Sequence, residues 1–230
     1  SYRALKGWSE MIALYDLMPE ALKRQVLVRE QLAFALNRRA GEKGRPEDRE
    51  KALALLQAVE QAQGPSAETC GLIGRIYKDQ WDAARSQDSR AARGYLKKAI
   101  DYYVRGFEAD SRDAYPGVNA VTLLEIQGDE ESGRKRDGLL PVVRFAVDQR
   151  LRGKSPDYWD YATMLELAVL ACDLEAADRH LDDALAAIRE RWEPETTARN
   201  LRLIQDARAA RGEGRDWLDA IASELEKRSR

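Results

Sequence analysis

The chain has 230 residues, and its 38 Lys and Arg nearly balance its 40 Asp and Glu, which leaves a formal net charge of -2. This balance argues against a nucleic-acid binder that relies on a large basic excess, and no stretch approaches the roughly 18 apolar residues of a membrane span. The two cysteines, Cys70 and Cys172, predict neither a disulfide framework nor a zinc site, so we expect a cytoplasmic protein.

Apolar residues recur at helical spacing almost without interruption, beginning with Leu5, Trp8, Ile12 and Tyr15. No alternating run of β-branched residues predicts a strand. We expect Pro141 in the first turns of its helix, where a missing N–H costs little. The pattern predicts an all-α fold of about eleven helices, with apolar stripes over residues 5–15, 28–35, 52–59, 73–84, 92–107, 120–127, 139–147, 158–172, 177–192, 201–204 and 218–225.

The breaks between these stripes are short and rich in Gly and Pro, so neighbouring helices should be antiparallel. Comparable positions in alternate helices recur about every 40 residues, against roughly 34 in a tetratricopeptide repeat. We therefore predict a right-handed, tetratricopeptide-like solenoid of antiparallel helix pairs, with residues 1–230 as a single domain.

The first helix would stand outside the five pairs that follow, as half of an earlier pair. Together with a start at Ser1 rather than Met, it indicates a fragment of a larger protein. An excess of Arg over Lys favours a bacterial source with a GC-rich genome.

Three stretches resemble a known family: residues 31–39 (QLAFALNRR), 71–79 (GLIGRIYKD) and 117–124 (GVNAVTLL). In that order they are similar to the central regulatory region, or TRAF-binding domain, of the apoptosis signal-regulating MAP kinase kinase kinases, and the resemblance runs from about Trp8 to Cys172. It implies a tetratricopeptide-like regulatory scaffold that binds partners, and the Arg-rich composition would make this chain a bacterial relative of the family. The kinase signatures themselves, a Gly-rich nucleotide loop, His-Arg-Asp and Asp-Phe-Gly, are missing from the sequence.

The three stretches fall on alternate helices, which should line the concave face of a solenoid. An Arg-rich groove with a few aromatic residues there would suit an acidic segment or a chain terminus. The alternative is an internal network, since Arg75 and Asp79 are spaced i,i+4 and can pair with each other. Gly71 and Gly74 predict close helix packing rather than a nucleic-acid loop. The candidate partner-binding residues are Asn37, Arg38, Arg39, Arg75, Tyr77, Lys78, Asp79, Asn119 and Trp159.

The sequence favours a non-catalytic scaffold that binds a protein or peptide, or positions a neighbouring effector domain of the same chain, in a signalling or stress-response protein. A small-ligand sensor that uses the concave surface for a nucleotide or metabolite is the alternative, and a dimerisation module is a third class. The single histidine, His180, lies on a charged helix, which is unlike a general base. We expect no catalytic residue, metal or cofactor.

Overall fold

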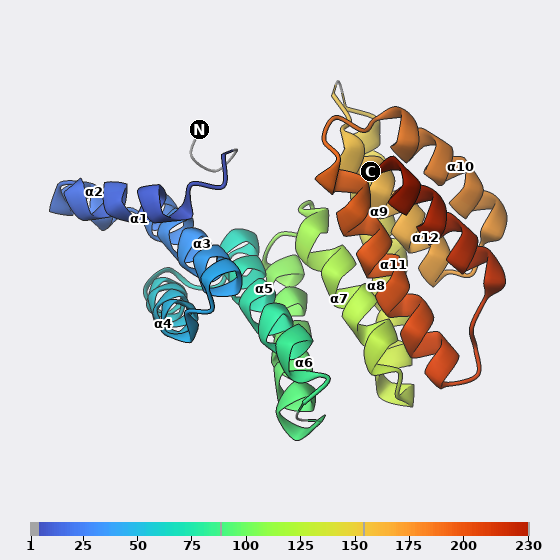
Figure 1. The fold of residues 1–230 in the computed structure, drawn as a ribbon, viewed down its shortest axis with the longest axis horizontal. Coiled ribbons are helices and arrows are strands. Elements are labelled where there is room, and N and C mark those ends of the chain that lie inside the picture. Colours follow the sequence, from blue (N-terminus) through green and yellow to red (C-terminus); the bar gives the residue numbers. More distant parts are fainter. Residues whose placement is uncertain (1–4, 88, 154, 230) are drawn as a thin grey trace. The chain divides into compact units, whose positions relative to one another are not determined.

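The structure is a computed structural model that describes residues 5–87, 89–153 and 155–229. The described residues form twelve helices joined by turns and loops, and they contain no strand (Figure 1). The predicted all-α class is confirmed. No helix in this part of the chain combines the length and the apolarity needed to cross a membrane.

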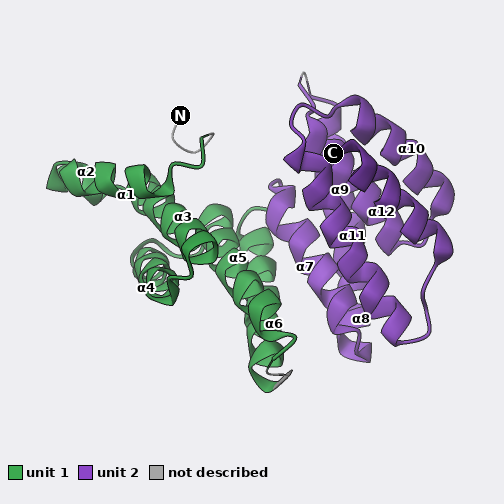
Figure 2. Cartoon of the chain, viewed as in Figure 1, with its two compact units in different colours: residues 1–110 green, residues 111–230 purple. Residues whose placement is uncertain are grey.

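The chain divides into two compact units, and the first spans Ser1–Asp110 (Figure 2). Within it α3 pairs with α4 and α5 with α6, while α1 packs on α3, as expected for a helix outside the pairs. The single turn of α2 was not predicted. The helices of this unit are α1 (Trp8–Leu17), α2 (Glu20–Lys23), α3 (Val26–Lys43), α4 (Pro46–Gln63), α5 (Ala67–Ala84) and α6 (Ser89–Ala109).

The second unit spans Ser111–Arg230 and contains three further pairs: α7 with α8, α9 with α10, and α11 with α12. The five predicted pairs are therefore present. That residues 1–230 act as a single domain stays a prediction. The helices are α7 (Ala114–Gln127), α8 (Glu130–Leu151), α9 (Tyr158–Leu170), α10 (Leu174–Ala186), α11 (Trp192–Ala210) and α12 (Asp216–Arg228).

The first helices of the pairs, α3, α5, α7, α9 and α11, start 41, 47, 44 and 34 residues apart. The expected period of about 40 residues is an average over this range. Longer helices in the middle pairs account for the excess over the tetratricopeptide norm, since α6 has 21 residues and α8 has 22.

The placement expected for Pro141 is wrong, because α8 begins nine residues earlier than its apolar stripe. The Asp129 carboxylate accepts from the Ser132 backbone N–H at 2.8 Å and caps the helix, and Glu130 and Glu131 follow in the first turn. Acidic groups at that end favour helix formation, so the polar run 129–131 starts a helix rather than a loop. Pro141 consequently lies inside α8, where it cannot donate to the carbonyl of Asp137.

The start of α11 also differs from the prediction. The apolar stripe 177–192 placed Trp192 at the end of the preceding helix, but Trp192 is the first residue of α11 and Pro194 is its third. Proline is tolerated in a first turn because the N–H groups there have no helical acceptor. α10 therefore ends at Ala186.

Gly74 permits the close contact between α5 and α6 in the first unit. A Cβ at this position would lie 2.9 Å from Cγ of Tyr103, whose side chain on α6 is fully buried. The predicted role of this glycine in close helix packing is confirmed. The absence of a side chain at Gly74 thereby lets α5 and α6 approach closely.

Candidate functional site

Three of the candidate residues form one hydrogen-bonded network between α3 and α5. The Asn37 side-chain amide donates to Asp79 at 2.8 Å, and Arg75 Nε donates to the other Asp79 oxygen at 2.9 Å. Arg49 Nε of α4 donates to the side-chain oxygen Oδ1 of Asn37 at 3.1 Å. The network joins three successive helices, as the internal alternative expects, and it holds Arg75 at the surface between α3 and α5.

Asp79 is the acidic centre of this network. Burial raises the pKa of its carboxyl, but the Arg75 guanidinium and the Asn37 amide outweigh burial and hold the pKa below its ordinary value of 3.8. The side chain therefore stays ionised at neutral pH and keeps both of its donors. Arg38 adds to the same field.

Arg39 is directed to α4 rather than to α5. Its guanidinium donates to both oxygens of the buried Asp48 carboxylate, with Nε at 2.6 Å and Nη2 at 2.8 Å. This hydrogen bonding is the largest influence on the carboxyl and lowers the pKa of Asp48. Bidentate pairs of this kind fix geometry, so Arg39 holds the α3–α4 pair together.

Arg38 lies on the same side of α3 as Phe34, one turn apart. Its guanidinium carbon is 5.1 Å from the centre of the Phe34 ring, within the range of a cation–π contact. A small hollow beside them is lined by Phe34, Asn37 and Leu56 together with Leu72 and Arg75 of α5. We call the half-buried residues Phe34, Arg38, Leu72 and Arg75 the α3–α5 surface.

Tyr77 and Lys78 are both buried and do not contribute to the α3–α5 surface. The Tyr77 ring stacks on Tyr102 at 5.7 Å and on Tyr95 at 6.5 Å, both from α6. Lys98 of α6 places its ammonium 5.2 Å from the Tyr77 ring centre. Burial, with a smaller contribution from Tyr95, raises the pKa of the Tyr77 phenol. Tyr77 thus belongs to the α5–α6 contact.

Asn119 and Trp159 belong to the second unit. The Asn119 amide donates to the carbonyl of Tyr115 within α7 at 2.9 Å. Trp159 packs against Trp192, with ring centres 5.5 Å apart. Among the seven candidates of the first unit, four share a surface or its supporting network: Asn37, Arg38, Arg75 and Asp79.

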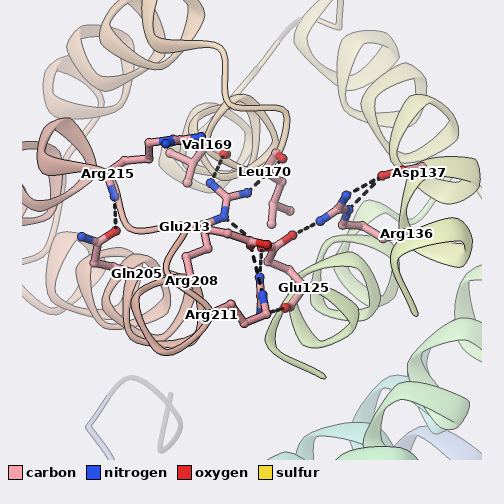
Figure 3. Close-up of polar contacts among 10 residues, drawn as sticks. All are labelled: Glu125, Arg136, Asp137, Val169, Leu170, Gln205, Arg208, Arg211, Glu213 and Arg215. Carbon is pink, nitrogen blue, oxygen red and sulfur yellow. Dashed lines mark hydrogen bonds and ion pairs between the residues drawn. The ribbon is translucent and has the colours of Figure 1, made fainter. Parts of the chain in front are cut away.

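Sequence reasoning missed a charged cluster around Glu125 in the second unit (Figure 3). This carboxylate of α7 is almost fully buried and accepts from Arg208 Nε at 2.9 Å and from Arg211 Nη2 at 2.7 Å, while Arg136 of α8 pairs with its other oxygen. Burial raises the pKa of Glu125, and the arginines, with Arg208 first, reverse that effect and lower it. Arg208 of α11 and Arg211, which follows that helix, are 83 and 86 residues away, a separation that no helical periodicity reveals.

Two of these arginines also satisfy carbonyls at helix ends. Arg208 donates to the carbonyls of Val169 and Leu170 at the end of α9, at 3.0 and 3.1 Å. Arg211 donates to the carbonyl of Glu125 at 3.0 Å, and its guanidinium occupies the space that a Cβ on Gly128 would fill. Gly128 itself ends α7 with a φ of 72°, which favours glycine. The cluster thus ties α7, α8, α9 and α11 together.

The chain shows sequence similarity along most of its length to known proteins. The MAP3K TRAFs-binding domain family matches residues 1–219. The chain is 31% identical to mitogen-activated protein kinase kinase kinase nsy-1 of Caenorhabditis elegans over 218 residues, which is 89% of this chain and 14% of that protein. It is 30% identical to mitogen-activated protein kinase kinase kinase 15 of Mus musculus over 213 residues, covering 89% of this chain and 15% of the relative.

These relatives are animal proteins and give no support to the bacterial source expected from the Arg-rich composition. The chain spans only about one seventh of their length. Among solved structures, a thermophilic TPR protein of Thermus thermophilus superposes with a TM-score of 0.61 at 14% identity, over 86% of this chain and 93% of that one. The tetratricopeptide-like solenoid fold is thereby confirmed, and the sequence match shows that the chain belongs to the MAP3K TRAFs-binding domain family.

Proposed function

We propose that this chain is a non-catalytic regulatory scaffold of a signalling protein in the cytoplasm, and that it binds a protein segment on the α3–α5 surface. The observation that carries the proposal is the pairing of Arg38 over Phe34 beside Arg75. The Arg38 guanidinium lies over Phe34, and Arg75 lines the neighbouring hollow together with Phe34 and Leu72. Arginine and aromatic side chains are the types that dominate binding energy at protein interfaces.

The polar network below the surface supports a binding role. Asp79 accepts a hydrogen bond from Arg75 and is itself held by the Asn37 amide, so the Arg75 side chain loses little rotamer freedom when a partner binds. The hollow beside it is about the size of one water molecule, which suits a single apolar side chain at its rim better than a nucleotide or metabolite. The geometry therefore favours the scaffold over the small-ligand sensor.

The chemistry of the surface selects the partner. Two arginines beside an aromatic ring complement a segment that carries a carboxylate next to an apolar side chain. The family description names TRAFs as the proteins bound by this domain, and a TRAF protein is accordingly the partner we propose. Because the matched relatives are kinases of which the domain forms a small part, the scaffold would act on a kinase domain of the same polypeptide.

The test is a binding titration of the chain against a purified TRAF protein, with wild type compared with Arg38→Glu. Arg38 is chosen in place of Arg75 because Arg75 also holds Asp79, so its loss would disturb the fold. Reversing the charge of Arg38 should weaken binding at least tenfold, equivalent to about 1.4 kcal/mol. The matched control is Lys51→Glu on the exposed side of α4, which makes the same charge change away from the surface.

Unchanged affinity of a folded Arg38→Glu variant would contradict the α3–α5 surface as the binding site. A chain that fails to bind any TRAF protein would contradict the proposed partner. Equal losses in Arg38→Glu and Lys51→Glu would show that general charge, rather than this surface, governs binding.

A further inference from the structure

Helix α8 of the second unit carries apolar residues on two of its sides. On the buried side, Val143, Ala146 and Val147 pack inside the unit. On the other side, the Phe145 side chain is 63% exposed and that of Val142 is 45% exposed. A helix with one side in the core is expected to be polar on the side that faces water. The exposed apolar pair therefore needs an explanation other than the core of this unit.

The two exposed apolar residues belong to a regular line of residues along α8. Steps of three and four positions alternate along this line, and every member is exposed: Lys135, Gly138, Val142, Phe145, Gln149 and Arg152, which ends the helix. We call these six residues the α8 stripe. Alternating steps of three and four keep residues on one side of a helix, and this is the spacing by which one helix packs lengthwise against another. The α8 stripe thus has the geometry of a helix-binding surface.

Gly138 provides space beside the apolar centre of the α8 stripe. A glycine inside a helix is less stable than an alanine, because it loses more conformational freedom on folding. A Cβ at Gly138 would meet no atom within 4 Å, so no neighbour in the described part of the chain requires a glycine here. The open space lies one turn before Val142 on the same line. A side chain from another helix can fit there next to Val142.

Positive charge bounds the apolar centre at both ends of the α8 stripe. Lys135 and Arg152 are 17 positions apart in the sequence, which corresponds to about 26 Å along a helix. Arg134 lies beside Lys135 and pairs with Glu130. Glu131, one turn before Lys135, is acidic and reduces the charge at that end, so Arg152 marks the more positive end. A binding partner with acidic residues beyond an apolar centre would complement this arrangement.

We infer that the α8 stripe binds an amphipathic helix of a partner protein, with apolar residues in the middle of that helix and acidic residues near its ends. The partner's apolar side would cover Val142 and Phe145 and use the space at Gly138, while its carboxylates pair with Lys135 and Arg152. Amphipathic helices bind other proteins by laying their apolar side on an apolar surface in this way. A helix of about 20 residues, or about 30 Å, spans the stripe. This inference does not rest on the proposed binding of a TRAF protein, which involves the α3–α5 surface.

The test is a titration of the full chain against two synthetic helical peptides of about 20 residues, followed by fluorescence anisotropy. Both peptides carry Leu at alternating steps of three and four in their middle turns. One has Glu in its first and last turns, and the other has Lys there. The Glu peptide should bind in the micromolar range, and the Lys peptide at least tenfold more weakly.

Charge reversal on the chain should invert this preference. Lys135→Glu/Arg152→Glu should bind the Lys peptide more tightly than the Glu peptide, because carboxylates then bound the apolar centre. The matched control is Lys51→Glu/Lys97→Glu, which makes the same charge change at exposed residues of α4 and α6. This control should keep the preference of wild type.

Two further variants test the apolar centre. Phe145→Ser should weaken binding of the Glu peptide at least tenfold and leave the thermal stability of the free chain unchanged, with Leu174→Ser, an exposed apolar residue of α10, as the control. Gly138→Gln fills the open space, so it should weaken binding without loss of stability. Its control is Gly133→Gln, five positions earlier and about 140° around the same helix, where a Cβ also meets no atom within 4 Å. Both controls should bind like wild type.

Several outcomes would overturn the inference. They are no saturable binding of the Glu peptide, equal affinities for the two peptides, full affinity in Phe145→Ser or Gly138→Gln, or a control that loses affinity equally. A free Phe145→Ser chain of lower stability would show that Phe145 packs within the chain itself. A wild-type chain that ignores both peptides but sediments with anionic lipid vesicles would assign the α8 stripe to a membrane surface instead. Arg38→Glu should bind the Glu peptide like wild type, which separates this result from the TRAF titration.

Discussion

The two units of the chain use buried charge in different ways. In the first, charged side chains bond to neighbouring helices: Asp48 pairs with Arg39, 9 residues away, and Asp79 accepts a hydrogen bond from Asn37, 42 residues away. In the second, Glu125 reaches arginines 83 and 86 residues away and ties the first helix of the unit to the third pair. The comparison indicates that the contacts named in the first unit join neighbouring pairs, whereas the second unit adds a long-range contact centred on Glu125 to local pairs such as Arg150 with Asp160.

The largest expected effect comes from removal of that carboxylate. Glu125→Ala leaves the Arg208 guanidinium buried without its counter-charge, which should cost about 3–5 kcal/mol of unfolding free energy. Urea denaturation gives the total. Hydrogen exchange shows which helices lose stability. We expect reduced amide protection in α7, α8, α9 and α11, and little change in α3–α6. Glu131→Ala, exposed on α8, is the control and should stay within about 0.5 kcal/mol of wild type. Equal loss of protection in both units would show that they unfold together.

A glycine substitution tests the first unit in the same way. Gly74→Ala forces a methyl group against the Tyr103 ring and should cost about 1–3 kcal/mol, through separation of α5 from α6. Gly94→Ala is the matched control on α6, where the added methyl group meets no atom within 4 Å. It should gain roughly 0.5–1 kcal/mol from helix propensity. Thermal or urea unfolding measures both variants, and a neutral Gly74→Ala would mean that Tyr103 can move aside at no cost.

Acidification weakens both units, with an effect of intermediate size. The pKa values of Asp79 and Glu125 are lower in the folded chain than their ordinary values of 3.8 and 4.5. Their ionised forms therefore stabilise the fold above those ordinary values, and this stabilisation is lost as pH falls through the folded pKa values. Each additional proton bound on unfolding changes the free energy by about 1.4 kcal/mol per pH unit. Urea titrations from neutral pH to pH 3 should give a smaller slope for Asp79→Asn and for Glu125→Gln than for wild type. If the variants and wild type lost stability equally with falling pH, Asp79 and Glu125 would not be the source of the acid sensitivity.

Helix capping gives the smallest effect and compares the two units directly. Ser66 accepts from the Thr69 N–H at 3.1 Å at the start of α5, and Asp129 accepts from Ser132 at the start of α8. Ser66→Ala and Asp129→Ala should each cost about 1 kcal/mol. A much larger loss for Asp129→Ala would indicate that the first turns of α8 depend on this cap because Pro141 interrupts the hydrogen bonding further along. Ser66→Thr and Asp129→Asn, which keep an acceptor oxygen, should recover most of the stability.

Much of the fold follows from the sequence because helical periodicity acts locally. The apolar spacing of residues such as Ile73 and Tyr77 determines which face of α5 is buried, and the short loops determine which helices pair. Helix ends were less predictable, because the start of α8 depends on the Asp129 cap and not on apolar residues, which begin only at Leu139.

The site was predictable only in part. The spacing of Arg75 and Asp79 gave their contact, because both lie on one helix. Arg38 and Arg39 are adjacent residues of the same type, so the sequence does not distinguish their roles. The packing of α4 against α3 brings Asp48 to Arg39. Glu125 had no local signal: its neighbours Leu124 and Ile126 are apolar, Arg136 comes from the next helix, and Arg208 and Arg211 come from the third pair of the unit.

Gly128 connects this cluster to the evolution of the family. Its left-handed backbone excludes most side chains, and the Arg211 guanidinium fills the space beside it. The two positions are therefore constrained as a pair. Relatives that replace Gly128 should also replace Arg211. Where only Arg211 is replaced, position 128 has more space, but its left-handed backbone still favours glycine. Covariation between positions 128 and 211 across an alignment is the trace that this contact would leave.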